Sequence, residues 1–305
     1  MANDSRLGMR LLVTGSEGFV GSELRRHHPC IPLADGDGNI DLRDTDRLGR
    51  ALRHIAPEAV IHLAAQSFVP ASFADPLETY EVNFIGTFAL LQALKSSGFK
   101  GRLLFIGSAD AYGVVSPEEL PVEETHPLRP RSPYAVSKVA AEALCYQWSE
   151  VEDFEIVMTR PFNHIGPGQS TRFVVSDFAR QVIEIRKGLR EPLIRTGDID
   201  ITRDFTDVRD VVEAYLLLLE RGRAGEVYNV CSGSEHSVRE VLERLMRFVG
   251  AEATVERDPS RMRPSEQRRM CGSPRKLERQ TGWTRQFGLD QSLQDVLRDW
   301  EAKLA

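Results

Sequence analysis

Three glycines near the N-terminus constrain the fold more than any other feature. Gly15, Gly18 and Gly21 form a GxxGxxG pattern that begins where the apolar segment 10–14 ends. A strand followed by this pattern predicts a tight turn into a helix at residues 18–28, whose free N–H groups and positive dipole end favour phosphate. The first glycine permits the turn, the second lets a pyrophosphate approach the backbone, and the third packs helix on strand. The alternative is a tight strand–helix turn without a ligand.

Short apolar runs alternate with amphipathic stretches through the first half of the chain. The apolar runs predict strands at residues 10–14, 31–33, 59–63, 102–107 and 155–160. The stretches between them predict helices at residues 18–28, 44–55, 77–97 and 134–150. This alternation predicts an α/β fold, a doubly wound parallel sheet covered by helices on both faces, with right-handed crossovers.

The pattern becomes less regular after Pro161. There we predict helices at residues 174–187, 208–220, 237–249 and 289–303, and short strands at 193–196 and 227–230. We expect a first domain over residues 9–162, to which residues 207–232 return. Residues 163–206 and 233–305 are expected to form a smaller C-terminal substrate-binding lobe, with a cleft shared between the two parts.

Composition excludes several classes of function. The 305 residues are 41% hydrophobic and 28% charged, as in ordinary globular proteins. A net charge of −6 argues against nucleic-acid binding, and no apolar run approaches the about 20 residues that span a bilayer. Residues 1–10 show no signal-peptide pattern. Because the cysteines lack CxxC spacing, we expect a cytoplasmic protein without a metal site, with free thiols at Cys30, Cys145, Cys231 and Cys271.

A tyrosine and a lysine one helical turn apart are the strongest candidates for catalysis. Tyr134 and Lys138 share one face of a predicted helix. A nearby ammonium stabilises phenolate, so we expect the pKa of Tyr134 to fall from about 10, which suits proton exchange with a carbonyl or alcohol oxygen. Ser108 follows the strand predicted at 102–107 and can hydrogen-bond the same oxygen. Taken singly, the alternatives are a surface side-chain pair and a turn cap.

An acidic residue follows the glycine pattern at the distance typical of ribose recognition. Asp35 lies twenty residues after Gly15, where a carboxylate often accepts a bond from a ribose 2′-hydroxyl. This placement favours NAD, because no arginine follows at once to hold a 2′-phosphate. Asp35 is equally well explained as the turn-forming residue of an Asp-Gly pair. Asp41 and Leu42 either flank an adenine or belong to an ordinary loop.

Several segments together resemble the extended short-chain dehydrogenases/reductases. They are GSEGFVG at 15–21, HLAAQS at 62–67, VNFIGT at 82–87, SADAYG at 108–113 and the Tyr134/Lys138 pair. The resemblance extends from Met9 to about Trp300 and implies a Rossmann-type domain that binds NADPH or NADH, with activity mostly on nucleotide sugars. Besides Asp35, Asp41 and Leu42, the implied cofactor-binding residues are Gly15, Gly18, Phe19, Val20, Gly21, Leu63, Ala64, Ala65, Asn83, Tyr134, Lys138 and Pro161.

The second half of the chain resembles the branch of this family that acts on GDP-mannose derivatives. The segments concerned are FNHIGPG at 162–168, GDIDITRDFTDVRD at 197–210 and RPSE at 263–266. The implied substrate-binding residues are Ser67, Ser108, Asp110, Asn163, Phe173, Val174, Lys187, Arg203, Arg263 and Glu266. Arginine suits a diphosphate because its planar fork bonds two oxygens at once. The alternatives are an Arg203–Asp207 pair, a solvated arginine face at 257–269 and an interior His164.

The branch contains 4,6-dehydratases and 4-ketoreductases, and one position separates them. The dehydratase segment resembles Ser/Thr-x-Glu-x-Tyr-Gly, whose glutamate removes the C5 proton. This chain has Asp110 there, which reaches about 1.3–1.5 Å less far. Because about 1 Å of misplacement costs on the order of a hundredfold in rate, we expect a reductase.

The expected reaction is NAD(P)H-dependent reduction of the C4 ketone of GDP-4-keto-6-deoxy-D-mannose to GDP-D-rhamnose. In it Tyr134 protonates the oxygen, while Ser108 and Lys138 assist. The alternatives are GDP-mannose 4,6-dehydratase, a reductase that forms GDP-6-deoxy-talose, and a C4 epimerase. A sensor without turnover is disfavoured, because this chain keeps the Tyr/Lys pair that such proteins typically lose.

The resemblance also implies a homodimer. Its interface is expected at the helices predicted over 77–97 and 134–150, which carry apolar residues on more than one face. In a monomer, the second lobe would cover those faces.

Overall fold

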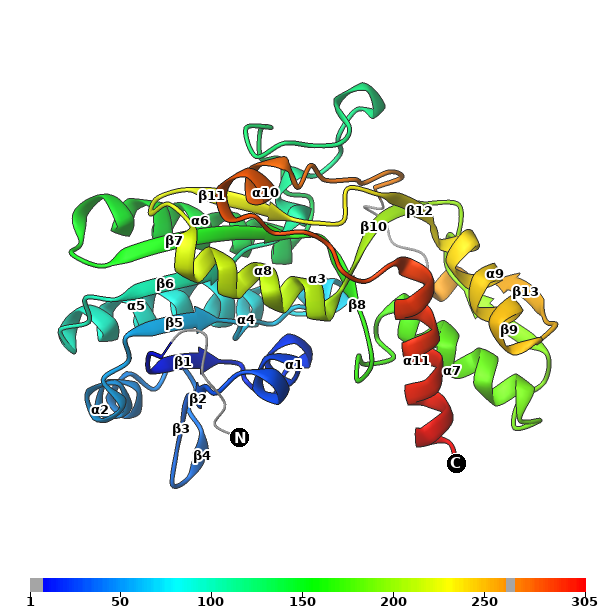
Figure 1. The fold of residues 1–305 in the computed structure, drawn as a ribbon, viewed down its shortest axis with the longest axis horizontal. Coiled ribbons are helices and arrows are strands. Elements are labelled where there is room, and N and C mark those ends of the chain that lie inside the picture. Colours follow the sequence, from blue (N-terminus) through cyan, green and yellow to red (C-terminus); the bar gives the residue numbers. More distant parts are fainter. Residues whose placement is uncertain (1–7, 262–266) are drawn as a thin grey trace.

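A six-stranded parallel sheet forms the centre of the protein. The computed structural model describes residues 8–261 and 267–305, and the strand order of its main sheet is β11–β7–β6–β5–β1–β2 (Figure 1). The strands are β1 (Leu11–Thr14), β2 (Ile31–Pro32), β5 (Ala59–His62), β6 (Arg102–Ile106), β7 (Glu155–Pro161) and β11 (Val227–Val230). Every residue of β1 and β5 is buried, as expected for strands covered on both faces.

The strand order reverses at β1. β2 pairs with one edge of β1 and β5 pairs with the other, both in parallel. The chain therefore leaves the carboxyl ends of β1 and β5 in opposite directions. Such a switch point opens a crevice at the carboxyl edge of the sheet, where doubly wound proteins bind their ligands. The predicted α/β, doubly wound architecture is confirmed.

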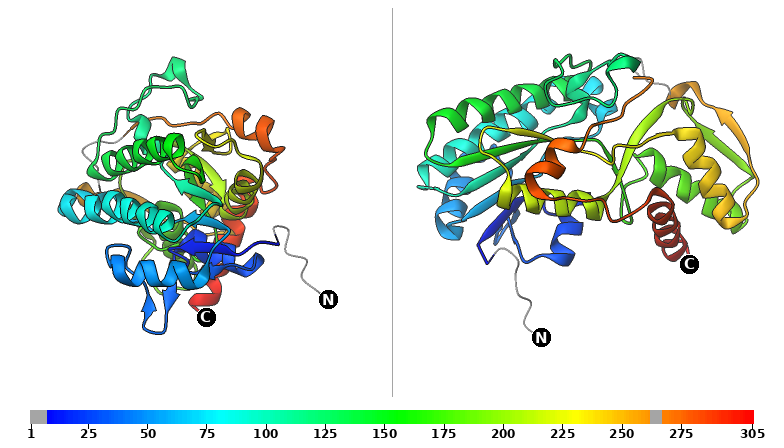
Figure 2. Two further views of the ribbon diagram at one scale, coloured as in Figure 1. Left: turned by 90° about the vertical axis from the view of Figure 1, so that its left-hand side faces the viewer. Right: turned by 45° about the horizontal axis from the view of Figure 1, so that its top comes forward.

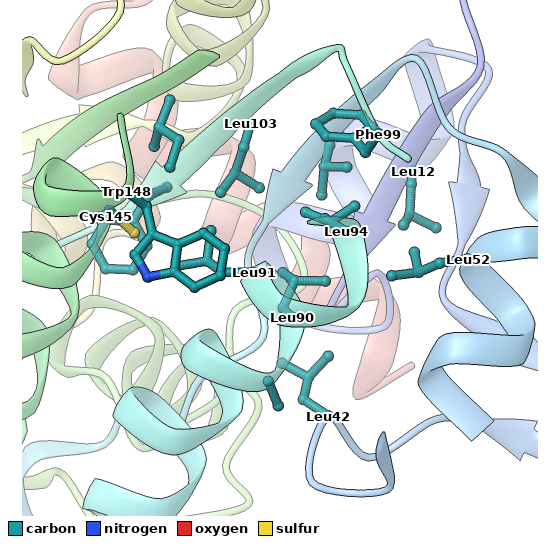
Figure 3. Packing of buried hydrophobic residues seen from close by; sticks show 14 of the residues in the cluster. Leu12, Leu42, Leu52, Leu90, Leu91, Leu94, Phe99, Leu103, Cys145 and Trp148 are labelled. Atoms are coloured by element: carbon teal, nitrogen blue, oxygen red, sulfur yellow. The ribbon is translucent and has the colours of Figure 1, made fainter. Parts of the chain in front are cut away.

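Helices cover both faces of the sheet (Figure 2). One face is covered by α2 (Thr45–Ile55), α5 (Gly86–Ser96) and α6 (Pro133–Val151). The other face is covered by α1 (Phe19–His27), α8 (Val208–Arg221) and α10 (Arg275–Thr281). Side chains alternate between the two cores along β1. Leu12 belongs to the core with α2 and α5 (Figure 3), whereas Leu11 and Val13 belong to the core with α8.

The helix predicted at residues 77–97 consists of three consecutive pieces. They are α4 (Pro76–Tyr80), a π-helical turn at Glu81–Ile85, and α5. Isolated π turns occur frequently at functional sites. This one contains the buried Asn83, whose hydrogen bonds bear on the site described below.

A smaller lobe lies beside the carboxyl edge of the main sheet (Figure 1). Its strands form one sheet in the order β12–β10–β8 and another in the order β13–β9. They are β8 (Asn163–Ile165), β9 (Leu193–Thr196), β10 (Thr202–Asp207), β12 (Glu235–Ser237) and β13 (Thr254–Arg257). The helices are α7 (Val174–Arg186), α9 (Val238–Val249) and α11 (Leu289–Lys303), which share a core of their own. One residue separates β7 from β8, and α8 follows β10 directly, so the two parts are joined without a linker.

Several short elements were not predicted from the sequence. They are the hairpin of β3 (Ala34–Asp35) and β4 (Gly38–Asn39), α3 (Val69–Ala74), α10, β8, β10, β12 and β13. Most of them have only two to four residues, and the longer α3, β10 and α10 carry mixed polar and apolar sequences without a clear hydrophobic period. Within residues 8–261 and 267–305, no helix is long and apolar enough to cross a membrane, and no group of His, Cys, Asp and Glu side chains is arranged to hold a metal ion. All four cysteines are free.

Candidate active site

A cleft of about 1290 Å³ lies between the carboxyl edge of the main sheet and the smaller lobe. The sheet contributes the segments that follow β1, β5, β6 and β7, and the lobe contributes residues of β8, β10 and α7. The cleft brings together most of the residues predicted to act there: Gly15, Gly18, Phe19, Val20, Gly21, Leu63, Ala64, Ala65, Ser67, Ser108, Asp110, Tyr134, Lys138, Pro161, Asn163, Phe173, Val174 and Arg203.

The glycine turn forms a cradle that has no room for side chains at its base. Gly15 adopts a φ of +68°, and a Cβ there would stand 2.7 Å from the amide nitrogen of Ala64. A Cβ on Gly21 would lie 2.6 Å from the carbonyl oxygen of Gly15. α1 begins after Gly18, and no side chain among the described residues caps it, so its first amides are left for an anionic ligand. The cradle therefore fits the pyrophosphate of a dinucleotide.

Two capped turns place Ser108 and Tyr134 in the cleft. Ser108 directly follows Gly107 after β6, and its hydroxyl accepts a hydrogen bond from the Asp110 amide at 3.2 Å. Tyr134 lies in the first turn of α6. The Ser132 hydroxyl caps that turn by accepting a bond from the Ala135 amide at 3.1 Å. Both hydroxyl groups thus belong to backbone segments whose direction is fixed locally.

Lys138 connects α6 to β6, the strand that precedes Ser108, through a hydrogen bond. Its Nζ donates a hydrogen bond to the carbonyl oxygen of Ile106 at 2.8 Å and lies 5.4 Å from the centre of the Phe105 ring. Tyr134 lies one helical turn earlier on the same side of α6. The lysine therefore positions the helix that carries Tyr134 against the end of β6.

Burial dominates the protonation states of these groups. It raises the pKa of the Tyr134 phenol, the Asp110 carboxylate raises that pKa further, and a hydrogen bond with Ser108 lowers it in part. The expectation that the pKa of Tyr134 falls is wrong for this structure, because desolvation of the phenolate by burial has the largest effect. Burial lowers the pKa of Lys138 itself to about 8. Tyr134 is thus held as a neutral phenol, the form that donates a proton.

Three residues predicted to bind the cofactor do not line the cleft. The Asp35 carboxylate lies in the β3–β4 hairpin, where it pairs with Arg47 at 2.6 Å and accepts a hydrogen bond from the Asp37 amide at 3.0 Å, as a turn-forming residue does. Asp41 pairs with Arg43 at 2.7 Å. Leu42 is buried in the core beside α5. Ion pairs and core packing hold these three side chains outside the lining of the cleft, and cofactor binding by these residues stays a prediction.

Asn83 and Lys187 also lie away from the cleft surface. Asn83 accepts a hydrogen bond from the Gln66 amide at 2.8 Å and donates to the Ser137 hydroxyl at 2.9 Å. It therefore positions the segment after β5 against α6 without lining the cleft. Lys187 donates to two carbonyl oxygens at the end of α11, where a cation favours the helix terminus. Its predicted role in substrate binding is corrected accordingly.

The contacts bear on two of the alternatives weighed from the sequence. Arg203 donates to the carbonyl oxygen of Gln267 at 2.7 Å, whereas Asp207 pairs with Arg209 at 2.8 Å, so an Arg203–Asp207 pair is not the arrangement observed. His164 lines the cleft and stacks on Phe19 at 6.0 Å between ring centres, and burial lowers its pKa. Arg263 and Glu266, which the sequence predicts to bind the substrate, lie outside the described residues.

The cleft is also lined by cationic and aromatic side chains that the sequence analysis did not single out. The cationic ones are Arg131, Arg172 and Arg261. Phe68 after β5 and Phe173 before α7 meet edge to face, with 6.5 Å between ring centres. The Arg172 guanidinium lies 5.6 Å from the Phe68 ring. These residues lie in loops or, for Arg261, in a short 3₁₀ turn at Pro259–Arg261, where no hydrophobic period marks them.

A buried hydrogen-bond chain joins the strand ends beneath the cleft. His62, at the end of β5, bonds the Thr14 hydroxyl at 2.7 Å through Nδ1 and the Thr87 hydroxyl at 3.0 Å through Nε2. The Thr87 hydroxyl donates in turn to the Asn83 carbonyl oxygen. Burial, with a smaller contribution from the Lys138 charge, lowers the pKa of His62 to about 3.

The depressed pKa of His62 makes stability depend on pH. Between pH 6.5 and about 3 the unfolded chain binds a proton on this side chain that the folded chain does not bind, so the free energy of unfolding falls as the pH falls. We expect His62→Asn to remove about 1.5 kcal/mol of the loss that the wild type shows between pH 6.5 and pH 5. Urea denaturation at both pH values measures it. The exposed His54→Asn is the control, and an equal pH dependence in all three proteins would contradict the prediction.

The fold and the cleft together define a class of protein. A glycine cradle at the switch point of a Rossmann-type sheet, facing a serine and a Tyr–Lys pair, is the arrangement of the extended short-chain dehydrogenases/reductases, which are NAD(P)-dependent oxidoreductases. Comparison with known proteins narrows the class. Residues 38–296 match the family model described as GDP-mannose 4,6 dehydratase, and the chain belongs to this family.

Individual relatives agree with this placement. The chain is 47% identical over 299 residues to the GDP-6-deoxy-D-mannose reductase of Pseudomonas aeruginosa, covering 97% of this chain and 98% of the relative. It is 28% identical over 288 residues to a GDP-mannose 4,6-dehydratase of Vibrio cholerae, covering 84% and 76%. The solved structure of RMD from Pseudomonas aeruginosa complexed with NADPH superimposes with a TM-score of 0.91 at 46% identity, covering 97% of this chain and 99% of that one.

Proposed function

We propose that this protein reduces the C4 ketone of GDP-4-keto-6-deoxy-D-mannose with NADPH or NADH to give GDP-D-rhamnose. The observation that carries the proposal is the placement of Ser108, Tyr134 and Lys138 in one cleft with the glycine cradle, with Lys138 fixed on the Ile106 carbonyl oxygen at 2.8 Å. A protonated donor suits reduction, in which a developing alkoxide must gain a proton. The likeness to the Pseudomonas reductase over 97% of the chain supports the same choice.

Residues of the main sheet are proposed to hold the dinucleotide. The pyrophosphate lies on the first amides of α1, where Gly15, Gly18 and Gly21 leave room for it. Bound there, the cofactor supplies a hydride to the substrate carbon. The segment Leu63–Ala65 and Pro161 complete the wall of this half of the cleft.

The reacting oxygen is proposed to bind between two hydroxyl groups. Ser108 donates a hydrogen bond that orients the ketone, and Tyr134 transfers its phenolic proton to the same oxygen as negative charge develops there. The Lys138 ammonium, fixed on the Ile106 carbonyl, adds positive charge beside the phenolate that remains.

The lobe is proposed to hold the sugar nucleotide. Asn163, Phe173 and Val174 line the side of the cleft opposite the glycine cradle. Arg172 and Arg203 of the lobe and Arg131 before α6 line the cleft and provide positive charge suited to a diphosphate, whereas Arg261 is paired with Asp177 at 2.7 Å. Binding by Arg263 and Glu266 stays a prediction from the sequence resemblance, as does the division into domains at residues 162, 207 and 232.

A second candidate function is the 4,6-dehydratase reaction on GDP-mannose. Asp110 lines the cleft and lies close enough to Tyr134 to affect its pKa. It stands where the dehydratase segment has glutamate, with a side chain shorter by about 1.3–1.5 Å. The shorter reach favours the reductase, because proton removal from C5 requires close placement of the base.

One assay separates these functions. The purified protein is mixed with NADPH or NADH and freshly prepared GDP-4-keto-6-deoxy-D-mannose, and the absorbance of the reduced nicotinamide is followed. Consumption that requires the sugar nucleotide supports the reductase, and sugar analysis then distinguishes rhamnose from 6-deoxy-talose at C4. Conversion of GDP-mannose to the 4-keto sugar without net consumption of the reduced cofactor would instead assign the dehydratase.

We also propose that two copies of the chain associate through α4 and α6, in the cytoplasm as the free cysteines suggest. These helices lie in contact and expose large apolar side chains, including Leu77 and Tyr146, with exposed fractions of 66% and 52%. An exposed apolar patch on neighbouring helices is typical of a protein interface.

Charged substitutions on this face are expected to separate the copies. The double variant Leu77→Glu/Tyr146→Glu should run as a monomer where the wild type runs as a dimer, because each copy would bury two unpaired carboxylates at the interface. Light scattering after gel filtration measures the mass. Leu189→Glu, an equally exposed position beyond α7, is the control. A wild type that is already monomeric would contradict the proposed association.

A further inference from the structure

Tyr215 is a buried tyrosine on α8 that also borders the cleft. The residue is 1% exposed and belongs to the same core as Val13, Ile61 and Leu104 of β1, β5 and β6. It is nevertheless one of the residues that line the cleft. The side chain therefore lies in the core on the α8 face of the sheet, directly beneath the floor of the cleft.

The hydroxyl of Tyr215 has no hydrogen-bond partner among residues 8–261 and 267–305. Other buried tyrosines of this chain satisfy theirs. The Tyr112 hydroxyl donates to the Asn229 side chain at 2.6 Å, and the Tyr228 hydroxyl accepts a bond from the Arg223 amide at 3.0 Å. Because an unpaired buried hydroxyl costs about 1–3 kcal/mol, such a group usually has a partner in the functional state.

The surroundings of Tyr215 indicate which ligand supplies that partner. Burial raises the pKa of the Tyr215 hydroxyl, and the Tyr134 phenol raises it further, so the two phenols lie within electrostatic range of each other. Gly15, which follows β1, and Ile106, which ends β6, line the same cleft. The Tyr215 hydroxyl therefore lies on the cofactor side, towards the end where the proton is transferred.

A nicotinamide ring near Tyr134 carries one polar substituent that matches this position. Its carboxamide has both a donor and an acceptor, and a tyrosine hydroxyl can serve as either. The adenosine end and the pyrophosphate bind away from Tyr134, on the glycine cradle and beyond it. A contact with the carboxamide would also fix the ring's rotation and therefore the face that it presents to the ketone.

We propose that the Tyr215 hydroxyl hydrogen-bonds the carboxamide of the nicotinamide and so orients the ring in the cleft. This inference rests on the proposed dinucleotide binding. It adds a cofactor-binding residue from α8, a helix to which the sequence patterns assigned no role in the site.

Tyr215→Phe tests the inference because it should leave the stability of the protein without ligand intact while it weakens binding of the dinucleotide. In the variant without ligand, the thermal midpoint should stay constant or rise by about 2 °C, because the substitution removes an unpaired buried hydroxyl. The Kd for NADPH, measured by fluorescence titration, should rise about five- to tenfold because one hydrogen bond is lost. The Kd for ADP-ribose 2′-phosphate, which lacks the nicotinamide, should stay equal to that of the wild type. The same titrations with NADH and ADP-ribose apply if the wild type binds NADH more tightly.

Tyr228→Phe is the matched control, because that hydroxyl is paired within the protein and does not line the cleft. It should lower the thermal midpoint by about 2 °C and leave both Kd values unchanged. The inference is overturned if Tyr215→Phe leaves the Kd for NADPH unchanged, weakens both ligands equally, or lowers the thermal midpoint as the control does. Failure of the wild type to bind either dinucleotide would overturn the proposed function itself, and the inference with it.

Discussion

Replacing Tyr134 by phenylalanine is expected to lower turnover about 10²–10⁴-fold, the usual contribution of a positioned proton donor. The substitution removes one oxygen and keeps the ring that fills the space at the start of α6. In the wild type, burial and the Asp110 carboxylate keep the phenol protonated. No second phenol among the cleft residues replaces it directly, since Tyr215 lies on the floor of the cleft with its ring in the core. The rate is measured from loss of the reduced-nicotinamide absorbance under saturating substrate.

Binding measurements separate a chemical defect from a structural one. The Kd of Tyr134→Phe for NADPH should stay within a few-fold of the wild type, because the glycine cradle that holds the pyrophosphate is unchanged. Tyr228→Phe removes a hydroxyl that is bonded to the Arg223 amide away from the cleft, and should retain the wild-type rate. If Tyr134→Phe turns over at the wild-type rate, another group supplies the proton and the proposed mechanism is wrong.

The parts of the fold that depend on local sequence were predicted well. The glycine turn requires a positive φ at Gly15 and close packing at Gly21, and both requirements appear directly as residue types. The Tyr134/Lys138 spacing fixes a shared helix face whatever the surrounding structure. For the same reason, the continuous apolar runs of β1 and β5 already indicate strands buried on both faces.

The contacts that the sequence did not reveal join residues that lie far apart in the chain. Asp35 has the expected spacing for ribose recognition, but Arg47 reaches it from α2. Lys187 bonds the end of α11, more than a hundred residues later in the chain. The direction of the pKa shift at Tyr134 depends on how completely the fold removes water from the phenol, which the spacing to Lys138 does not show.

Glu142 lies one helical turn after Lys138, on the same face of α6 as Tyr134 and Lys138, and it forms a buried ion pair. Its two carboxylate oxygens accept bonds from Arg160 of β7 at 2.6 and 3.0 Å. Both side chains are at least nine-tenths buried. The Arg160 guanidinium also donates to the Tyr112 hydroxyl at 3.0 Å. This pair therefore joins the catalytic helix to the strand that leads into the substrate lobe.

Glu142→Ala is expected to lower the free energy of unfolding by about 3–5 kcal/mol, because it leaves the Arg160 guanidinium buried without its counter-charge. The double variant Glu142→Leu/Arg160→Met should recover most of this loss, since it removes both charges at similar volume while Tyr112 keeps its bond to Asn229. Urea denaturation gives the three values.

Asp153→Ala, which breaks the exposed pair with Lys100, should leave stability unchanged and serves as the control. A double variant no more stable than Glu142→Ala would show that the charges themselves stabilise the fold. Recovered stability with low turnover would instead assign the pair to the placement of Tyr134, because the helix would then be folded but no longer held at the angle that the reaction requires.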